Sequence, residues 1–465
     1  MSGIHALPLL VDVASWFPRA NSQVVPAAIG TFALASVVKI LAFFVAYLGT
    51  VSLLTLAERK VAAWIQDRRG PNRAGPGGIL QPVADGIKNF FKELSKPGDV
   101  DKWLFLIAPA LSFIPAMLTW AVIPFAAPLP TPWGLIDMSV ANLPVGFLFT
   151  LAISSLGVYG IVLAGWSSNN KYALLGGLRS SAQMVSYEIA MGMSTIPVLL
   201  LAGNVSLGAI VQQQAGMGWN VLSLTIAWIT FLIAAFAETN RLPFDLPEAE
   251  SELVAGYHTE YSGMMFAMFF IAEYANMITV SALTATLFFG GWDIPFTQWD
   301  NLPPWTVLKT LLTLGAFATK TGFFLFLFMW VRWTLPRFRY DQLMSLGWSI
   351  MLPVALAYIV IIASVTLGLD ALGLARGMYF SLSLLAMNIV LLFVLFGWLD
   401  RGRLISPASP RVGTSELVRL RARGIERAQL ARGGGAIAPF EAVVPPTPAL
   451  ASGSGVAPAI TGGQD

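Results

Sequence analysis

Residues 346–369 read LGWSIMLPVALAYIVIIASVTLGL, an uncharged apolar stretch that decides the fold class. A hydrocarbon core about 30 Å thick is crossed by roughly 20 apolar residues in an α-helix. This stretch therefore predicts a transmembrane helix. With eight other stretches of the same kind, it predicts nine spans, at 31–57, 103–124, 142–166, 173–201, 219–238, 261–289, 305–332, 346–369 and 377–399.

The composition agrees with a membrane protein. Of the 465 residues, 56% are hydrophobic and only 11% are charged, whereas soluble domains carry about 25% charged residues. Tryptophans near many predicted span ends favour the headgroup level, which supports the boundaries. We therefore expect an all-α fold, a polytopic membrane protein with about nine transmembrane helices.

Lysine and arginine predict the orientation of these spans. The loop 58–102 holds nine of these basic residues, whereas the loops 125–141, 202–218 and 290–304 hold none. Loops rich in lysine and arginine stay in the cytoplasm. The pattern predicts an N-terminus outside and a C-terminus in the cytoplasm.

The two ends of the chain differ from the expected transmembrane domain, residues 31–400, whose main cytoplasmic loops are 58–102 and 238–260. Residues 1–30 predict an interfacial amphipathic segment, and they lack the features of a removed signal peptide. Residues 401–465 are basic and then rich in Pro, Gly and Ala. We expect a largely disordered cytoplasmic tail whose arginines lie on anionic headgroups. Docking of this tail onto a partner protein is the alternative.

The first cytoplasmic loop combines a basic turn with an amphipathic helix. Residues 67–78 read DRRGPNRAGPGG, in which Gly and Pro favour tight turns. In the following segment 79–94, apolar residues occupy one helical face, opposite Asp85, Lys88 and Lys92. This pattern predicts a helix lying along the membrane surface. Two interpretations stay open. The loop is basic only because cytoplasmic loops are rich in lysine and arginine, or it forms a basic pocket at headgroup level that suits a polar head on an apolar tail.

The second cytoplasmic loop is acidic. Residues 238–260 hold six carboxylates and one arginine, Arg241. Prolines keep the segment from forming a regular helix. Carboxylates at this density repel one another, so we expect raised pKa values for some of them.

Three ionisable residues, Glu188, Glu273 and Lys320, lie inside predicted spans. A charge at bilayer depth costs about 2.5–3.5 kcal/mol, and such residues usually mark ion or proton paths. A buried pair that fixes helix packing is the simpler alternative. Together with Glu238 and the acidic loop, Glu188 and Glu273 predict a series of proton-accepting groups that runs from the cytoplasmic side toward mid-membrane.

The chain has no cysteine and only two histidines, His5 and His258. The absence of cysteine excludes disulfides, thiolate-held iron–sulfur clusters and zinc–cysteine sites within this chain. A haem held by two histidines between spans is not expected, and we assign His258 no role. Any electron carriers that serve this protein are expected in other chains.

Five stretches resemble signature segments of one family, namely AERK at 57–60, RGPNR at 69–73, LQPVADGIK at 80–88, ETNRLPFDLPE at 238–248 and FIAEY at 270–274. The family is the H subunit of the proton-pumping NADH:quinone oxidoreductase, respiratory complex I, the equivalent of mitochondrial subunit 1. The resemblance covers residues 30–400. The tail after residue 401 extends beyond the common core of the family.

The resemblance implies a protein that forms a quinone-binding chamber and links quinone reduction to proton translocation. The quinone-binding positions that match are Arg59, Arg69, Arg73, Asp85 and Lys88. The positions that match the acidic proton path are Glu188, Glu238, Asp245, Glu248, Glu250, Glu252, Glu260 and Glu273. No cofactor is expected on this chain alone. Quinone is the implied substrate, and FMN and iron–sulfur clusters are implied in partner subunits.

The implied partners are the peripheral quinone-site subunits, the adjacent membrane subunits and the lipid bilayer. Binding of nucleic acid is not expected. The implied location is the bacterial inner membrane, with several passes. Two alternatives remain. The first is a membrane component of a related hydrogenase or dehydrogenase complex. The second is a self-sufficient cation-coupled transporter, which would need a solute site at broken helices.

Overall fold

The computed structural model describes residues 29–399 except 96, 132–133, 246–254, 296, 298 and 374–376. Residues up to Val394 form one compact unit, and Leu395–Leu399 are the described part of a second unit. The expected tail 401–465 and residues 1–28 of the expected interfacial segment lie outside the described residues.

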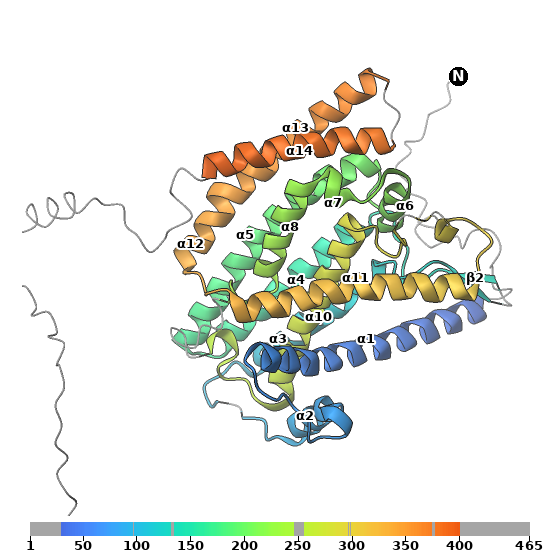
Figure 1. The fold of residues 1–465 in the computed structure, drawn as a ribbon. Coiled ribbons are helices and arrows are strands. Elements are labelled where there is room, and N and C mark those ends of the chain that lie inside the picture. Colours follow the sequence, from blue (N-terminus) through green and yellow to red (C-terminus); the bar gives the residue numbers. More distant parts are fainter. Residues whose placement is uncertain are drawn as a thin grey trace, which may run out of the picture. The chain divides into compact units, whose positions relative to one another are not determined.

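Helices form most of the regular structure in the described part of the chain (Figure 1). The α-helices are α1 (Ile29–Ile65), α2 (Gln81–Phe91), α3 (Lys102–Leu118), α4 (Gly146–Ser167), α5 (Lys171–Ala202), α6 (Leu207–Met217), α7 (Asn220–Ser223), α8 (Thr225–Glu238), α10 (Gly263–Phe288), α11 (Val307–Thr334), α12 (Tyr340–Ser345), α13 (Leu352–Ala371) and α14 (Met378–Leu399). Shorter turns are η2 (Pro76–Gly78), η3 (Thr119–Val122), η4 (Gly256–His258), η5 (Trp299–Asn301) and the π-helical turn η6 (Leu346–Met351).

Seven helical segments in the described residues are long and apolar enough to cross a membrane. They are Ser36–Ile65, Lys102–Val122, Gly146–Ser167, Lys171–Ala202, Gly263–Phe288, Val307–Thr334 and Tyr340–Ala371. The expected α-helical, multi-pass membrane fold is therefore confirmed. The two remaining expected spans coincide with the shorter apolar helices Thr225–Glu238 and Tyr379–Leu395. The count of nine and the orientation stay predictions.

Local signals explain where the long helices begin and end. The Asn170 side chain accepts a hydrogen bond from Tyr172 N at 2.9 Å at the start of α5, and the Thr306 side chain accepts from Lys309 N at the start of α11. Such caps satisfy the backbone donors that a first helical turn leaves unpaired. Helix α5 ends at Ala202 and is capped by Gly203, whose φ of 63° is left-handed and suits a glycine.

The expected span 219–238 is broken, which hydropathy alone does not reveal. Leu224 has φ −135° and ψ 46°, so the chain leaves helical geometry between α7 and α8. The buried Asn388 of α14 donates to the Ser223 carbonyl at 2.7 Å and accepts from Tyr358 OH of α13 at 2.8 Å. A break inside a membrane needs such partners, because lipid offers no hydrogen bonds to the freed backbone.

Prolines fix two further features. Pro109 of α3 has no N–H for the carbonyl one turn earlier, that of Phe105. The Tyr261 hydroxyl donates to this carbonyl at 3.2 Å, and the rings of Phe105 and Tyr261 stack with centroids 4.0 Å apart. The π-helical turn η6 ends two residues before Pro353 of α13, and its wider turn avoids the clash of the proline ring with the preceding turn.

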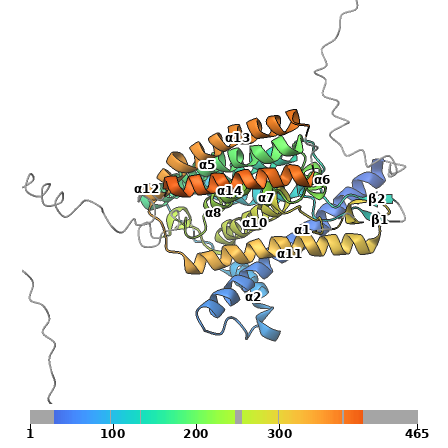
Figure 2. The same cartoon turned by 45° about the horizontal axis from the view of Figure 1, so that its top comes forward.

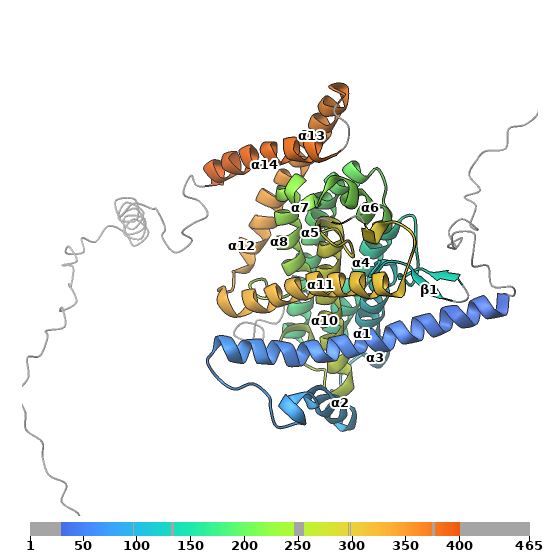
Figure 3. The same cartoon turned by 45° about the vertical axis from the view of Figure 1, so that its right-hand side comes forward.

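Helix α10 lies at the centre of the first unit, between α8 on one side and α1 on the other (Figures 2 and 3). The Tyr47 hydroxyl of α1 donates to the Ala275 carbonyl of α10 at 2.8 Å. Phe236 of α8 packs on Phe328 of α11, with ring centroids 4.1 Å apart. Two antiparallel strands, β1 (Leu129–Thr131) and β2 (Gly134–Ile136), and α6 occupy loops in which the sequence predicts no regular structure.

The amphipathic segment expected at 79–94 contains helix α2 at Gln81–Phe91. Its apolar side chains are exposed, among them Val83, Ile87, Phe90 and Phe91. In all three views α2 lies beside α1, on the side away from α13 (Figures 1–3). Its placement along a membrane surface stays a prediction.

Candidate functional site

A cavity of about 370 Å³ lies between α1, α2 and α10. Three of the predicted quinone-binding residues, Arg59, Asp85 and Lys88, contribute to its polar wall. Its apolar wall is formed by Val51, Pro82, Phe90, Met264, Phe266, Ala267, Phe270 and Ile271. The cavity therefore has a charged end and an apolar end. Its volume is within the usual range of small-molecule sites.

An ion pair connects the helices that flank this cavity. Arg59 Nη1 of α1 lies 2.6 Å from Asp85 Oδ2 of α2, and both side chains are partly exposed. Gln81 also donates to Asp85, at 3.1 Å. Exposed pairs of this kind contribute about 0–1 kcal/mol, so the contact orients α2 more than it stabilises the fold.

A close backbone contact at Gly78 helps to shape the turn between α1 and α2. Gly78 has a φ of 83°, and a Cβ atom there would lie 2.2 Å from the Pro71 carbonyl oxygen. Lys60 Nζ donates to the Gly77 carbonyl at 2.6 Å. Arg69 and Arg73, the other two predicted quinone residues, are exposed and do not line the cavity.

A buried ion cluster lies on the other side of Tyr274, a residue of the cavity wall. The Tyr274 hydroxyl donates to Glu58 Oε2 of α1. The Glu58 side chain also pairs with Arg332 of α11 and with Arg241, at 3.3 Å for the latter. Tyr274 thus lines the large cavity and also donates its hydroxyl into the ion cluster.

Arg241 is the centre of this cluster. It is 3% exposed, its Nε lies 2.8 Å from Glu273 Oε1, and its guanidinium carbon lies 4.4 Å from the centroid of the Tyr274 ring. Burial lowers the pKa of Arg241, but the carboxylates of Glu273 and Glu58 outweigh burial and hold that pKa above its ordinary value. The arginine therefore stays charged.

Asp245 lies at the rim of the cluster, in the loop after α8. It accepts a hydrogen bond from Arg337 Nη2 at 3.0 Å. Burial raises the pKa of Asp245, although the guanidinium groups of Arg337, Arg332 and Arg241 oppose the rise. The direction matches the expectation for the acidic loop, but its cause is burial and not the repulsion between carboxylates on which that expectation rests.

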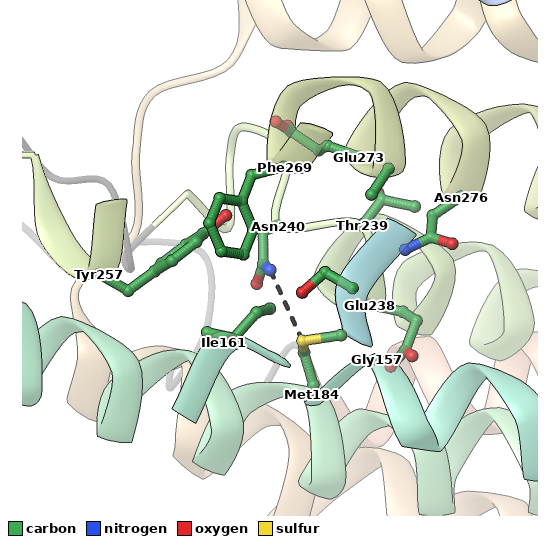
Figure 4. Close-up of a pocket in the computed structure, with 12 residues that line it drawn as sticks. Gly157, Ile161, Met184, Glu238, Thr239, Asn240, Tyr257, Phe269, Glu273 and Asn276 are labelled. Carbon is green, nitrogen blue, oxygen red and sulfur yellow. Dashed lines mark hydrogen bonds between the residues drawn. The ribbon is translucent and has the colours of Figure 1, made fainter. Parts of the chain in front are cut away.

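A second, small cavity of about 30 Å³ separates Glu273 from Glu238. Figure 4 shows the side chains of Glu238 and Asn240 directed into the same space, with Asn240 donating to Met184 Sδ at 3.7 Å. Glu238 is 5% exposed, and Glu188 of α5 acts on it as a repelling charge. Glu238 and Glu273 therefore share one cavity, and Glu188 lies near enough to Glu238 for their charges to interact.

The structure places the other predicted acids differently. Glu260 accepts a hydrogen bond from Asn170 Nδ2 at 2.8 Å, at the start of α5. The predicted path residues Glu248, Glu250 and Glu252 lie outside the described residues. Within the described residues, no group of three or more His, Asp or Glu side chains could hold a metal ion.

Comparison with known proteins identifies the family. The model of the NADH dehydrogenase family matches residues 38–363. The chain belongs to this family. The H subunit of NADH-quinone oxidoreductase from Leptospira biflexa is 54% identical over 338 residues, which cover 70% of this chain and 93% of the relative. The H subunit numbered 1 from Geobacter metallireducens is 51% identical over 323 residues (70% and 94%). The H subunit from Rickettsia bellii is 51% identical over 337 residues (72% and 94%).

These matches confirm the resemblance to the family of H subunits and the expectation that the chain is part of an enzyme, because the relatives are components of NADH-quinone oxidoreductase. The assignment of individual residues to quinone binding or to a proton path stays a prediction.

Four members of the ion cluster were not predicted as site residues, namely Glu58, Arg241, Tyr274 and Arg332. Arg241 was noted only as the single arginine of the acidic loop. Glu58 and Arg332 lie near span ends, where charges are ordinary, and Tyr274 reads as an aromatic core residue. Their one signal was proximity in sequence, since Glu58 precedes Arg59 and Tyr274 follows Glu273. Nothing in the sequence predicts that α1, α10 and α11 converge on one carboxylate.

Lys320, the cation expected inside the seventh span, has a structural role. Its Nζ donates to the carbonyls of Phe289, Gly291 and Asp293 at 2.7, 3.0 and 2.5 Å, directly after α10 ends. A cation at a helix C-terminus is stabilised by the helix dipole. The geometry supports the packing alternative for this residue, away from the acidic series.

His258 makes the loop beside the large cavity sensitive to acid. Its ring packs against Tyr257 and Phe266, and burial lowers its pKa to about 4. A free histidine has a pKa of about 6.5, so between these values the unfolded segment binds more protons than the folded one. Stability is therefore full above pH 6.5 and falls as the pH falls, by about 2 kcal/mol at pH 5.

We expect hydrogen exchange of residues 255–262 in the intact enzyme, corrected for intrinsic rates, to be faster at pH 5 than at pH 7. His258→Gln should remove most of this difference. Equal protection factors at the two pH values in the wild-type protein would contradict the expectation.

Proposed function

We propose that this chain is the membrane component of an NADH:quinone oxidoreductase in which the quinone-binding chamber meets an acidic proton path. It forms this chamber together with the peripheral arm of the enzyme, and it couples quinone reduction to proton translocation. The observation that carries the proposal is the position of Tyr274, which lines the large cavity and donates to Glu58 in the buried ion cluster.

The large cavity suits a quinone in its chemistry. A quinone has a polar head with two carbonyl oxygens and an apolar isoprenoid tail. Arg59, Lys88 and Asn89 offer hydrogen-bond donors at the polar wall, and the apolar wall offers phenylalanine and aliphatic side chains. The exposed apolar face of α2 supports its placement at the membrane surface, where a quinone would enter from lipid. Arg69 and Arg73 are proposed to act nearer the peripheral subunits.

The acidic series supports proton transfer away from this cavity. Arg241 is held between Glu58 and Glu273, so a change in charge or position near Tyr274 alters the balance of the cluster. Glu273 then shares the small cavity with Glu238, and Glu238 is beside Glu188. The proposed path includes Asp245 at the rim of the cluster and, in addition, Glu248, Glu250, Glu252 and Glu260.

The proposal also covers location and partners. Nine spans, an outside N-terminus and a cytoplasmic C-terminus place the loops 58–102 and 238–260 on the cytoplasmic face of the bacterial inner membrane, where peripheral subunits dock. FMN and iron–sulfur clusters belong to those partners, and other membrane subunits flank this one. The basic and Pro/Gly/Ala-rich tail 401–465 is a separate cytoplasmic segment.

A cavity-filling substitution tests the quinone site. Ala267 lines the large cavity and is 8% exposed. Ala267→Phe adds a ring to the cavity wall, and we expect KM for a short-chain quinone to rise by about tenfold, the loss of roughly 1.4 kcal/mol of binding. Electron transfer from NADH to ferricyanide, which bypasses the quinone site, should not change in membranes that contain the intact enzyme.

Val45→Phe is the matched control, because Val45 lies on an exposed face of α1 away from the cavity lining. It should leave both activities unchanged. An unchanged KM for quinone in a fully assembled Ala267→Phe enzyme would refute the quinone site proposed here.

A further inference from the structure

Two buried oxygen atoms in the small cavity have no hydrogen-bond partner among the described residues. They are Ser112 Oγ of α3 and Glu238 Oε2 of α8. Ser112 is 7% exposed and Glu238 is 5% exposed. Both residues line the cavity that also contains Glu273 and Asn276. Buried polar atoms almost always find a partner, and an unpaired one commonly indicates water.

Ser112 differs in this respect from several buried helical serines in the described part of the chain. Ser186 donates to the Ala182 carbonyl at 2.6 Å, and Ser281 donates to the Met277 carbonyl at 2.8 Å, each one turn back in its own helix. A serine hydroxyl in a helix commonly makes this local bond. No such bond is present for Ser112, so its hydroxyl is available to the cavity.

The neighbouring helix gives Ser112 room. A Cβ atom at Gly160 of α4 would lie 2.2 Å from Ser112 Oγ, so only a glycine fits opposite the hydroxyl. Each water molecule needs about 10–15 Å³ of cavity volume. The cavity of about 30 Å³ therefore has room for about two waters. Each would find several polar partners in Ser112, Glu238, Asn276 and Glu273.

We propose that Ser112 binds an ordered water molecule that bridges to the Glu238 carboxyl group, and that Ser112 is thereby a positioning residue for proton transfer between Glu238 and Glu273. The water accepts or donates at Ser112 Oγ and donates to Glu238 Oε2. A second water completes the connection toward Glu273. The water site rests on the geometry of the cavity alone, whereas its role in turnover rests on the proposed function.

The water site is tested directly by a high-resolution cryo-EM map of the intact enzyme. We expect solvent density within hydrogen-bond distance of both Ser112 Oγ and Glu238 Oε2, and loss of this density in Ser112→Ala. A wild-type map with an empty cavity, or with Ser112 bonded to another protein group, would overturn the proposal.

The role in turnover is tested by Ser112→Ala in membranes, with Ser281→Ala as the control for loss of an equally buried hydroxyl. Loss of one hydrogen-bonded water should lower kcat of coupled quinone reduction by about threefold to tenfold, with KM for quinone and the amount of assembled enzyme unchanged. Ser112→Thr, which keeps the hydroxyl, should restore most of kcat. Equal kcat in Ser112→Ala and wild type would overturn the positioning role.

Glu238→Gln separates this inference from the proposed function. If Glu238→Gln lowers coupled turnover and Ser112→Ala does not, only the role of Ser112 fails. If Glu238→Gln in an assembled enzyme has normal turnover, the proton path itself fails, and the positioning role fails with it. The cryo-EM density decides the water site in either case.

Discussion

Replacing Arg241 by glutamine is expected to remove most of the assembled enzyme from the membrane. Arg241 is buried between the carboxylates of Glu58 and Glu273. Without the guanidinium group, Glu273 loses its ion-pair partner in a site with little water, whereas Glu58 keeps its pair with Arg332. Removing one partner of a buried ion pair costs about 3–5 kcal/mol, a large share of the stability of a typical domain. Native gels of solubilised membranes measure the assembled fraction.

Two control variants make this expectation specific. Arg59→Gln removes an arginine from the exposed pair with Asp85 and should leave assembly unchanged. The double variant Arg241→Gln/Glu273→Gln also removes the carboxylate that the single variant leaves without a partner, and it should recover part of the assembled enzyme. A wild-type level of intact, thermally stable Arg241→Gln enzyme would contradict the role of the cluster.

The double variant Glu188→Gln/Glu238→Gln is expected to assemble normally but to lose coupled activity. Neither carboxylate has an ion-pair partner among the described residues, so its removal leaves no orphaned cation. A glutamine keeps the shape of the side chain but cannot accept a proton. A positioned proton-transfer group contributes about 100-fold to 10,000-fold, so we expect quinone reduction and proton pumping to fall by about tenfold or more. Both are measured in proteoliposomes.

Glu93→Gln is the control for loss of a carboxylate, because Glu93 is exposed in the loop after α2. Its turnover and pumping should match those of the wild type. Normal pumping by the fully assembled double variant would exclude Glu188 and Glu238 from the path.

Much of the fold could be predicted from the sequence, because lipid imposes simple rules. Each of the nine apolar stretches contains a helix in the structure, and the long ones end within a few residues of the expected bounds. The exceptions have local causes. Helix α1 continues to Ile65, past the apolar core, because the residues after Glu58 still favour a helix. The break at Leu224 depends on a hydrogen bond from the distant Asn388.

The site was predictable only in part. Glu188 and Glu273 stand out because a charge inside an apolar span is costly, and the structure brings both to Glu238. The partners of these acids were not predictable, because Glu58 and Arg332 lie at positions where charge costs little. The unpaired hydroxyl of Ser112 could not be foreseen either, since a serine in an apolar helix ordinarily bonds to its own backbone.

The central claim is that the large cavity and the buried ion cluster form one site, joined by Tyr274. The most direct test is a cryo-EM structure of the intact enzyme with a quinone, or an inhibitor that competes with quinone, bound. The account predicts ligand density between α1, α2 and α10, in contact with the Tyr274 ring and next to Arg59. Ligand density confined to other subunits, with this cavity filled by partner side chains or lipid, would contradict it.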